Sequence, residues 1–458
     1  MKSSRRLSGV FASLAAESPA APALLDTNAR VEATRRDLEA LAGEHSLAYQ
    51  QRGLLPGHRV LVLVHPCVET VASLLACWKI GSTVIQVSQA VSQQDCRDLA
   101  TLVGAQWILD ARIADASAAL QPTGVVGGDG TVEDALLVMT SGSSGTPKVV
   151  RHTHETVLAG CTMVTNAWEV TELDRLALAL PWSHVHGLII GLLGTLLVGG
   201  SIEMHEKFDP EVVAEAASRG ATMFYGVPTM YHRLDRSGLV DGLRGLRLCV
   251  SGSAPLDSGL SERLATNGVP VLERYGMTET LLTLSNPLHG ERRPGWVGLP
   301  FDGVQLRIAS TGELLVKTPA ASPGFLAPVA MELPVDEDGY FATGDLVEQD
   351  ASGWIRIAGR SSDLIITGGV NVFPAEVEAV LLNVAGVADV AVAGRPSEEW
   401  GEEVVAWVIP IGDSIDLEVL RKAAEDSLRP PARPKRYVQC AEFPRTELGK
   451  VQRRALKG

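Results

Sequence analysis

The sequence predicts an α/β protein with more than one domain, and three observations carry this prediction. Strand-like apolar runs at residues 59–64 and 82–87 flank a helical run at residues 68–80. Residues 221–226 and 246–251 repeat the pattern, each followed by helical sequence. Continuously apolar strands that alternate with helices are typical of mostly parallel sheets covered by helices. The chain has 458 residues, more than one hydrophobic core usually holds.

The sequence pattern changes at about residue 300. Short β-like pieces at residues 304–308 and 313–317 are separated by turn residues, which predicts a β-rich subdomain over about residues 300–358. The following sequence predicts a small α+β domain, with a helix that begins at Pro374 and two strands after it. The predicted domains are residues 1–361, which include the subdomain, and residues 362–458.

Composition and charge exclude several classes of function. The chain has 40 basic and 54 acidic residues, a net charge of −14, which argues against a broad nucleic-acid or anionic-membrane surface. Its longest apolar run, residues 187–199, is shorter than the roughly 20 residues of a membrane span, so we expect a buried helix there. The six cysteines form no C-x-x-C pair, as expected for free thiols in a reducing compartment. Residues 7–16 predict an amphipathic helix rather than a signal peptide, and we expect a cytoplasmic protein.

A Ser- and Gly-rich loop that closes with a lysine, residues 139–148 (MTSGSSGTPK), is the most informative stretch. It follows a strand-like apolar run at residues 135–139, and its glycines permit positive φ angles. Backbone N–H groups and hydroxyls of such a loop can converge on one anion. The P-loop pattern G-x-x-x-x-G-K-[ST] is absent, so a flexible turn is the alternative for this stretch alone. The candidate phosphate-binding residues are Thr140, Ser141, Gly142, Ser143, Ser144, Gly145, Thr146 and Lys148.

A second motif, residues 274–280 (RYGMTET), follows the β-like stretch 269–273. The Tyr275 ring can stack on a base, the Thr278 hydroxyl can bond a phosphate, and Glu279 can hold Mg²⁺. A turn with incidental polar residues is the alternative.

Three further residues complete the set. Asp345, in a T-G-D run, can accept hydrogen bonds from both ribose hydroxyls, or it ends an ordinary strand. Arg360 follows Gly359, and Lys450 follows Gly449 near the C-terminus. Taken alone, Lys450 is more simply explained as a solvated surface charge.

The order of these motifs resembles that of the adenylate-forming (AMP-binding) enzymes, which include acyl-CoA synthetases, adenylation domains of peptide synthetases and luciferases. The resemblance covers nearly the whole chain. Residues 224–234 (FYGVPTMYHRL) and 272–276 (LERYG) look, more narrowly, like malonyl-CoA and methylmalonyl-CoA synthetases. In such enzymes a carboxylate attacks the α-phosphate of ATP, pyrophosphate leaves, and a thiol takes the acyl group from the adenylate.

The resemblance implies a role for each matching residue. The 140–148 loop would hold the β- and γ-phosphates, Thr278 would contact the α-phosphate, and Glu279 would bind Mg²⁺. Lys450 would bridge the α-phosphate and the attacking carboxylate, where charge stabilisation matters more than a nucleophile. The residues expected at the adenosine are Gly252, Ser253, Ala254, Tyr275, Gly276, Met277, Asp345 and Arg360.

The resemblance also implies a small C-terminal domain that changes orientation between adenylation and thiol transfer. The hinge falls at Ser362, where relatives usually carry Asp or Lys. Gly368 and Gly369 would let the pantetheine arm of coenzyme A pass close to the backbone.

The acid pocket is expected around the segment 181–187 (PWSHVHG). His184 would lie near the carboxylate and the α-phosphate, whereas a structural role is the alternative for His186. Arg274 stands where many relatives have a small residue, and a buried arginine calls for an anionic partner. We therefore expect Arg274, with Arg233 as a second candidate, to select malonate or a 2-substituted malonate.

Three hypotheses follow. The first is an AMP-forming ligase that joins a small acid to coenzyme A, with ATP and Mg²⁺ and without nucleic-acid or membrane partners. The second is a stand-alone adenylating enzyme that activates an unusual oxyacid or loads a carrier protein. The third is a non-catalytic nucleotide-binding protein, which loss of Glu279, Asp345 or Lys450 would favour, and all three are present.

Overall fold

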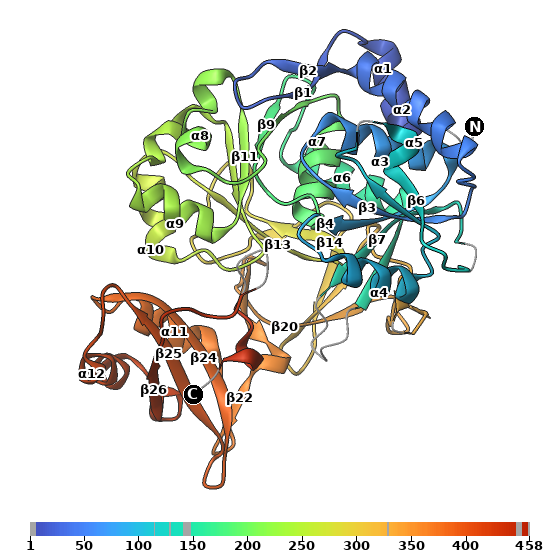
Figure 1. Cartoon of the computed structure of the whole chain (residues 1–458). Coiled ribbons are helices and arrows are strands. Elements are labelled where there is room, and N and C mark those ends of the chain that lie inside the picture. The colour runs from blue at the N-terminus through green and yellow to red at the C-terminus, as the bar shows by residue number, and fades with distance from the viewer. Residues whose placement is uncertain are drawn as a thin grey trace. The chain divides into compact units, whose positions relative to one another are not determined.

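A computed structural model describes residues 6–113, 115–127, 130–140, 148–327, 329–445 and 451–456. The chain forms two compact units (Figure 1). The first comprises Met1–Gln305 and Val316–Phe341, and the second comprises Leu306–Leu315 and Ala342–Gly458.

A nine-stranded sheet dominates the first unit. Its six central strands, β13 to β1 in the order below, run parallel, and the strands at both edges are antiparallel to their neighbours. The strands in order are β15 (Leu299–Pro300), β14 (Leu281–Ser285), β13 (Leu272–Met277), β12 (Leu248–Ser251), β11 (Met223–Gly226), β9 (Arg175–Leu178), β10 (Ser201–Met204), β1 (Pro22–Leu25) and β2 (Val31–Thr34).

An eight-stranded sheet lies in the same unit. Four central strands, β7, β4, β3 and β5, run parallel, and antiparallel strands flank them. The order is β19 (Met331–Glu332), β18 (Gly324–Ala327), β8 (Lys148–Thr153), β7 (Asp134–Thr140), β4 (Thr83–Ser88), β3 (Arg59–Val64), β5 (Trp107–Asp110) and β6 (Leu120–Pro122).

Helices cover both sheets because their apolar faces pack on apolar strands. On the nine-stranded sheet, Tyr231 and Leu234 of α9 and Leu260 of α10 share a buried core with Phe224 of β11. The helices are α1 (Leu7–Glu17), α2 (Arg35–Gln51), α3 (Val68–Ile80), α4 (Gln93–Val103), α5 (Ala116–Ala119), α6 (His154–Ala167), the π-helix η2 (His186–Leu193), α7 (Gly194–Leu196), α8 (Pro210–Ala214), η3 (Ala217–Arg219), α9 (Pro228–Arg236), η4 (Val240–Gly245) and α10 (Ser258–Thr266).

The second unit contains a four-stranded sheet that extends into a few residues of the first, followed by a five-stranded sheet. Val377 and Leu381 of α11 pack with Leu420 of α12 on buried valines of the five-stranded sheet. The four-stranded sheet is β16 (Gln305–Ile308), β17 (Glu313–Lys317), β20 (Phe341–Gln349) and β21 (Ile355–Arg360). The remaining elements are η5 (Ser361–Asp363), β22 (Ile365–Thr367), β23 (Val370–Val372), α11 (Pro374–Leu382), β24 (Val387–Ser397), β25 (Gly401–Pro410), α12 (Leu417–Ser427), η6 (Pro430–Ala432), β26 (Arg436–Gln439) and η7 (Arg453–Ala455).

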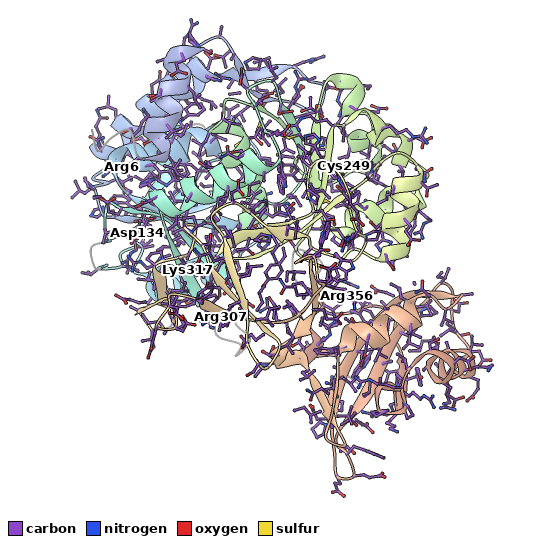
Figure 2. All side chains as sticks on the ribbon, turned by 180° about the vertical axis from the view of Figure 1, so that it is seen from behind. Arg6, Asp134, Cys249, Arg307, Lys317 and Arg356 are labelled. Atoms are coloured by element: carbon purple, nitrogen blue, oxygen red, sulfur yellow. The ribbon has the colours of Figure 1, made fainter. Side chains whose placement is uncertain are left out.

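The structure confirms the predicted fold class, a large α/β part with mostly parallel central strands and a smaller α+β part. The hinge predicted at Ser362 lies in η5 and stays a prediction, as do the predicted domain limits. The six cysteines are free, and four of them are buried, including Cys249 inside the first unit (Figure 2). Within the described parts of the chain, every helix is too short or too polar to cross a bilayer.

One prediction needed correction, and a second is confirmed with added detail, since the buried helix contains a π-helical part. The motif at residues 274–280 was expected after a strand, but Arg274, Tyr275, Gly276 and Met277 lie inside β13 and pair with β14. The buried helix expected over residues 187–199 begins as the π-helix η2 and only then becomes α-helical at α7.

Candidate active site

The predicted phosphate loop connects two antiparallel strands. Thr140 is the last residue of β7, Lys148 is the first residue of β8, and the two face each other across the ladder. The Lys148 side chain is exposed, and its ammonium lies 5.5 Å from the centre of the Phe325 ring. The residues between them that were predicted to bind phosphate lie outside the described residues: Ser141, Gly142, Ser143, Ser144, Gly145 and Thr146.

Several other candidates gather at the carboxyl ends of neighbouring parallel strands. Gly226 at the end of β11 pairs with Ser251 at the end of β12, and Ser251 pairs with Glu273 of β13. Gly252 and Arg274 are each the next residue along the chain, so they leave the same edge of the sheet. In open α/β sheets this edge is the usual place for ligands.

Gly252 makes room for the Arg274 side chain. A Cβ at Gly252 would lie 2.3 Å from both Cζ and Nε of Arg274, far closer than atoms can approach. Ser253, the next residue, has φ of 72°, an uncommon conformation for a residue other than glycine. Such local strain often accompanies functional sites, because the surrounding structure must maintain it.

Arg274 is a buried cation without a carboxylate partner. It is 6% exposed, and Nη2 lies 3.5 Å from Ser253 Oγ. Nε has no hydrogen-bond partner, and no ion pair to Arg274 occurs among the described residues. Burial lowers the pKa of Arg274 from its usual high value to about 9, so the guanidinium remains charged at neutral pH. A buried charge of this kind is costly unless an anion compensates it.

Two histidines follow β9 in the same unit. His184 is half-buried, and its backbone N–H lies 3.4 Å from the Pro181 carbonyl. His186 opens η2, is buried, and stacks on the Tyr225 ring at a centroid distance of 6.2 Å. Burial, and then the positive charge of Arg274, hold the pKa of His186 well below 6.5. His186 is therefore a neutral ring near Arg274, and neither ring nitrogen has a hydrogen-bond partner.

The turn after β13 carries the two residues predicted to act on the α-phosphate and on Mg²⁺. The Thr278 carbonyl accepts a hydrogen bond from His152 Nε2 at 2.7 Å, and the Glu279 carbonyl accepts one from the Ser322 N–H at 2.8 Å. Within the described residues, no group of three or more His, Cys, Asp or Glu could cage a metal. Glu279 fits Mg²⁺ as a single carboxylate ligand, because Mg²⁺ at such sites is held mainly by waters and substrate phosphates.

The β13–β14 hairpin fixes the residues expected around the base. A Cβ at Gly276 would lie 2.3 Å from the Leu281 carbonyl oxygen, so only glycine fits this close crossing of two strands. Tyr275 and Met277 flank it in β13, both half-buried, and Ala254 lies in the exposed loop after β12.

In the second unit, the structure brings Asp345 and Arg360 together. They face each other across β20 and β21, and Arg360 Nε lies 2.7 Å from Asp345 Oδ1. Asp345 is 3% exposed, which agrees with a carboxylate held in a fixed orientation by a charge-assisted hydrogen bond.

The predicted pantetheine residues form the turn of a hairpin. Gly368 and Gly369 connect β22 to β23 with φ of 56° and 76°, the positive pair that tight hairpin turns require. A Cβ at Gly368 would lie 3.0 Å from the Trp400 ring, whereas nothing lies within 4 Å of one at Gly369.

One candidate is not brought to these groups, and another lies outside the described residues. Arg233 is exposed on α9, with its guanidinium 4.9 Å from the centre of the Phe208 ring, and no described contact joins it to Arg274. Lys450 lies outside the described residues.

Comparison with protein families identifies the chain. The family of AMP-binding enzymes matches residues 11–326, and the AMP-binding enzyme C-terminal domain matches residues 376–450. The chain belongs to the AMP-binding enzyme family. It is therefore an acid–thiol ligase of the AMP-forming acyl-CoA synthetase type.

Known relatives of this AMP-binding enzyme are CoA ligases. A malonate–CoA ligase of Arabidopsis thaliana is 31% identical over 91% of this chain and 80% of its own length. A sulfoacetate–CoA ligase of Cupriavidus necator is 34% identical over 70% of this chain and 66% of its own. Among solved structures, ATP-bound MatB from Rhodopseudomonas palustris is 29% identical and superimposes with a TM-score of 0.88, covering 98% of this chain and 97% of the other. ATP and coenzyme A are accordingly its substrates.

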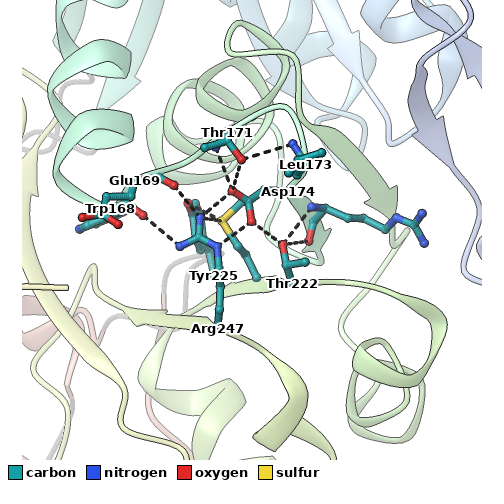
Figure 3. A network of polar contacts seen from close by, with 10 residues as sticks. Trp168, Glu169, Thr171, Leu173, Asp174, Thr222, Tyr225 and Arg247 are labelled. Atoms are coloured by element: carbon teal, nitrogen blue, oxygen red, sulfur yellow. Dashed lines mark hydrogen bonds and ion pairs between the residues drawn. The ribbon is translucent and has the colours of Figure 1, made fainter. Parts of the chain in front are cut away.

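A polar network that sequence reasoning missed holds the opposite ends of the same strands (Figure 3). Asp174, Thr222 and Arg247 each lie within one residue of the start of β9, β11 and β12. Arg247 donates to both Asp174 oxygens at 2.7 and 2.6 Å, and Thr222 Oγ1 lies 2.7 Å from Asp174 Oδ1. Burial raises the pKa of Asp174, but hydrogen bonds from Arg247 and others outweigh it and leave the pKa lowered. This AMP-binding enzyme thus pairs its charges at one end of the sheet, whereas at the other end Arg274 has no ion-pair partner among the described residues.

Proposed function

We propose that this AMP-binding enzyme activates a small acid with a second anionic group, malonate or a 2-substituted malonate, and transfers it to coenzyme A. The observation that carries the proposal is Arg274, which is buried and charged and has no carboxylate partner in the part of the chain that the structure describes. An acid with one carboxylate leaves such a cation uncompensated. A second carboxylate on the substrate forms a charge-assisted, bidentate pair with it.

The chemistry of the relatives supports this proposal. Malonate and sulfoacetate are both small acids with a second anionic group, and relatives named for both are similar to this chain. Both relatives are CoA ligases, which favours coenzyme A over a carrier protein as the acceptor.

Within the first unit, the proposed roles divide between the two sides of β13. Arg274 and the neutral His186 take the far carboxylate, while His184 lies towards the reacting carboxylate and the α-phosphate. Thr278 contacts the α-phosphate, and Lys148 neutralises the pyrophosphate that leaves. Each group supplies charge or a hydrogen bond at a fixed position, which is how phosphoryl-type transfers are mainly accelerated.

The remaining roles belong to the adenosine, the metal and the thiol. Glu279 would hold Mg²⁺ together with the phosphates, and the bound ion would help to neutralise the negative charge of the pyrophosphate. Asp345 and Arg360 bind the ribose, Lys450 bridges the α-phosphate and the attacking carboxylate, and the hairpin at Gly368 admits pantetheine.

The test is an acid panel with ATP and Mg²⁺, in which pyrophosphate release is measured with and without coenzyme A. Malonate and methylmalonate should outperform acetate, butyrate and sulfoacetate, and acyl-CoA should form in proportion to pyrophosphate. A preference for acetate or butyrate would refute the dicarboxylate assignment, and a preference for sulfoacetate would move it to a sulfonated acid. Release of pyrophosphate without transfer to coenzyme A would favour an adenylating enzyme with another acceptor.

A further inference from the structure

His152 is a buried residue that the proposed mechanism does not use. It is 0% exposed, lies in β8, and its Nε2 is 2.7 Å from the carbonyl oxygen of Thr278, 126 positions further along the chain. Its Nδ1 lies 3.2 Å from the hydroxyl oxygen of Thr156. Both ring nitrogens therefore have partners, in contrast to those of His186.

These contacts determine the tautomer of His152. A carbonyl oxygen only accepts hydrogen bonds, so Nε2 carries the proton and donates it to Thr278. Nδ1 is then the acceptor and faces the Thr156 hydroxyl. Thr156 is itself fixed, because its Oγ1 also accepts from the Thr153 N–H at 3.0 Å in the N-terminal cap of α6.

A second contact holds the next carbonyl of the same turn. The Ser322 N–H donates to the Glu279 carbonyl at 2.8 Å, and Ser322 Oγ donates to the Arg151 carbonyl at 2.6 Å. Arg151 and His152 are neighbours in β8, so one strand fixes two consecutive carbonyls, directly through His152 and indirectly through Ser322. Arg151 is anchored in turn to Asp134 of β7 at 3.1 Å (Figure 2 labels Asp134).

We propose that His152 is a positioning residue that fixes the Thr278–Glu279 turn for the metal–nucleotide complex. The inference rests on the proposed function, since it assumes that this turn binds the α-phosphate and Mg²⁺. β8 begins at Lys148, only four residues before His152, and leads out of the predicted phosphate loop. The same short strand therefore couples the predicted pyrophosphate site to the predicted α-phosphate site, and His152 is the direct link.

The test compares His152→Leu, which removes the donor, with His152→Gln, whose side-chain amide can place a donor near Nε2. His154→Leu is the matched control, because His154 is also buried in this stretch but contacts the Leu7 N–H at 3.4 Å, away from the turn. Three quantities are measured on each purified variant: Tm, the Kd for ATP with Mg²⁺ by calorimetry, and the Mg²⁺ dependence of malonate-dependent pyrophosphate exchange.

His152→Leu should lower kcat for exchange about 10- to 100-fold and raise the Mg²⁺ concentration needed for half-saturation, since a lost buried hydrogen bond costs about that factor. His152→Gln should recover a large part of both, and His154→Leu should change Tm alone. Wild-type kcat and Mg²⁺ dependence in His152→Leu, or failure of the Gln variant to recover them, would overturn the inference. If the Leu variant does not fold, Ser322→Ala replaces it, with the same shift in Mg²⁺ dependence expected and an unchanged dependence counting against the inference.

Failure of this inference can be distinguished from failure of the proposed function. If the wild-type enzyme shows no malonate-dependent exchange, the proposed function fails. The calorimetric Kd for ATP with Mg²⁺ then still decides whether His152 positions the turn, because weaker binding in His152→Leu and recovery in His152→Gln need no acid.

Discussion

Replacing Arg274 with Met should raise the free energy of unfolding and lower the activity on malonate. Burial lowers the pKa of this group from its usual high value to about 9, which at 1.36 kcal/mol per pKa unit sets an upper limit of about 5 kcal/mol on the cost of the buried charge. Relaxation and water reduce this figure in real proteins, and a gain of about 1–3 kcal/mol in the free energy of unfolding is expected. Met retains most of the apolar volume, so the neighbouring Gly252 and Ser253 need not rearrange.

The same substitution should cost activity on dicarboxylates only. Truncating one partner of a buried charge pair costs about 2–5 kcal/mol, so kcat/KM for malonate should fall at least about 30-fold. Butyrate has no second carboxylate, and its kcat/KM should stay within a few-fold of wild type or rise. The assay is pyrophosphate release on malonate, acetate and butyrate, together with urea unfolding of the free enzyme. Equal losses on the three acids would refute the role assigned to Arg274.

Arg247 provides the matched control for this experiment. It is also an arginine at an end of the nine-stranded sheet, but it donates two hydrogen bonds to the buried Asp174. Arg247→Met leaves that carboxylate uncompensated and should destabilise the enzyme by about 2 kcal/mol or more. Its relative activities on malonate and butyrate should not change. If Arg247→Met and Arg274→Met shift stability in the same direction, the distinction between paired and unpaired charges is wrong.

Three further predictions address other parts of the chain. Lys450→Ala should raise the barrier to acid-dependent pyrophosphate exchange by about 3 kcal/mol, which slows the exchange roughly 150-fold. A synthetic malonyl-adenylate should still react with coenzyme A. Equal losses in both half-reactions would contradict the role of Lys450. Burial, and then the charge of Arg6, lower the pKa of His154 to about 4, so only the unfolded chain gains this proton as the pH falls from 6.5 to 4. The free energy of unfolding should therefore drop by about 3 kcal/mol across this window, and His154→Leu should flatten that part of the urea-unfolding profile. Gly368→Val places a branched side chain at φ of 56° against Trp400, and it should slow thioester formation more than adenylation when the two half-reactions are timed separately.

The local pattern of apolar residues predicted the buried strands well, because a strand that is buried on both faces is a continuous apolar run. The strand expected at residues 59–64 is β3 with the same limits, and the helix expected at 68–80 is α3. β13 was harder to predict, since its last four residues, Arg274–Met277, include an arginine, a tyrosine and a glycine rather than forming an apolar run. Pairing with β14 keeps these four residues extended, and the partner strand cannot be inferred from the motif itself.

The π-helix shows a different limit. An apolar run predicts burial, but it does not distinguish one helical winding from another. Here Gly187 and Gly191 permit close approach, since a Cβ at Gly187 would lie 2.2 Å from the Pro181 carbonyl oxygen and one at Gly191 would lie 2.8 Å from Leu178. π-helical turns are frequent at functional sites, and this one places His186 beside Tyr225.

The candidate site was predictable where side chains themselves carry the chemistry, and not where they act through the backbone. Arg274, Asp345 and Glu279 stand in recognisable motifs. The structure places Asp345 in contact with Arg360 across two strands, and their predicted role at the ribose stays a prediction. His152 and Ser322 could not be found this way, because each holds a carbonyl oxygen that every residue type possesses. Only the fold reveals which distant backbone atom such a side chain reaches.

Arg247 and Arg274 lie on one sheet, and their surroundings differ as a structural residue differs from one proposed to bind a ligand. Arg247 forms an ion pair with Asp174, so its charge is compensated in the free enzyme. Arg274 lies at the other end of the parallel strands, against a glycine that leaves it just enough space and a serine hydroxyl at 3.5 Å. A protein that needed only stability would place a carboxylate or an apolar side chain there, since either lowers the free energy of the folded state. The proposed function gives a reason for a cation that has no carboxylate partner among the described residues: its anion would arrive with the substrate, and the free enzyme would be less stable than it could be.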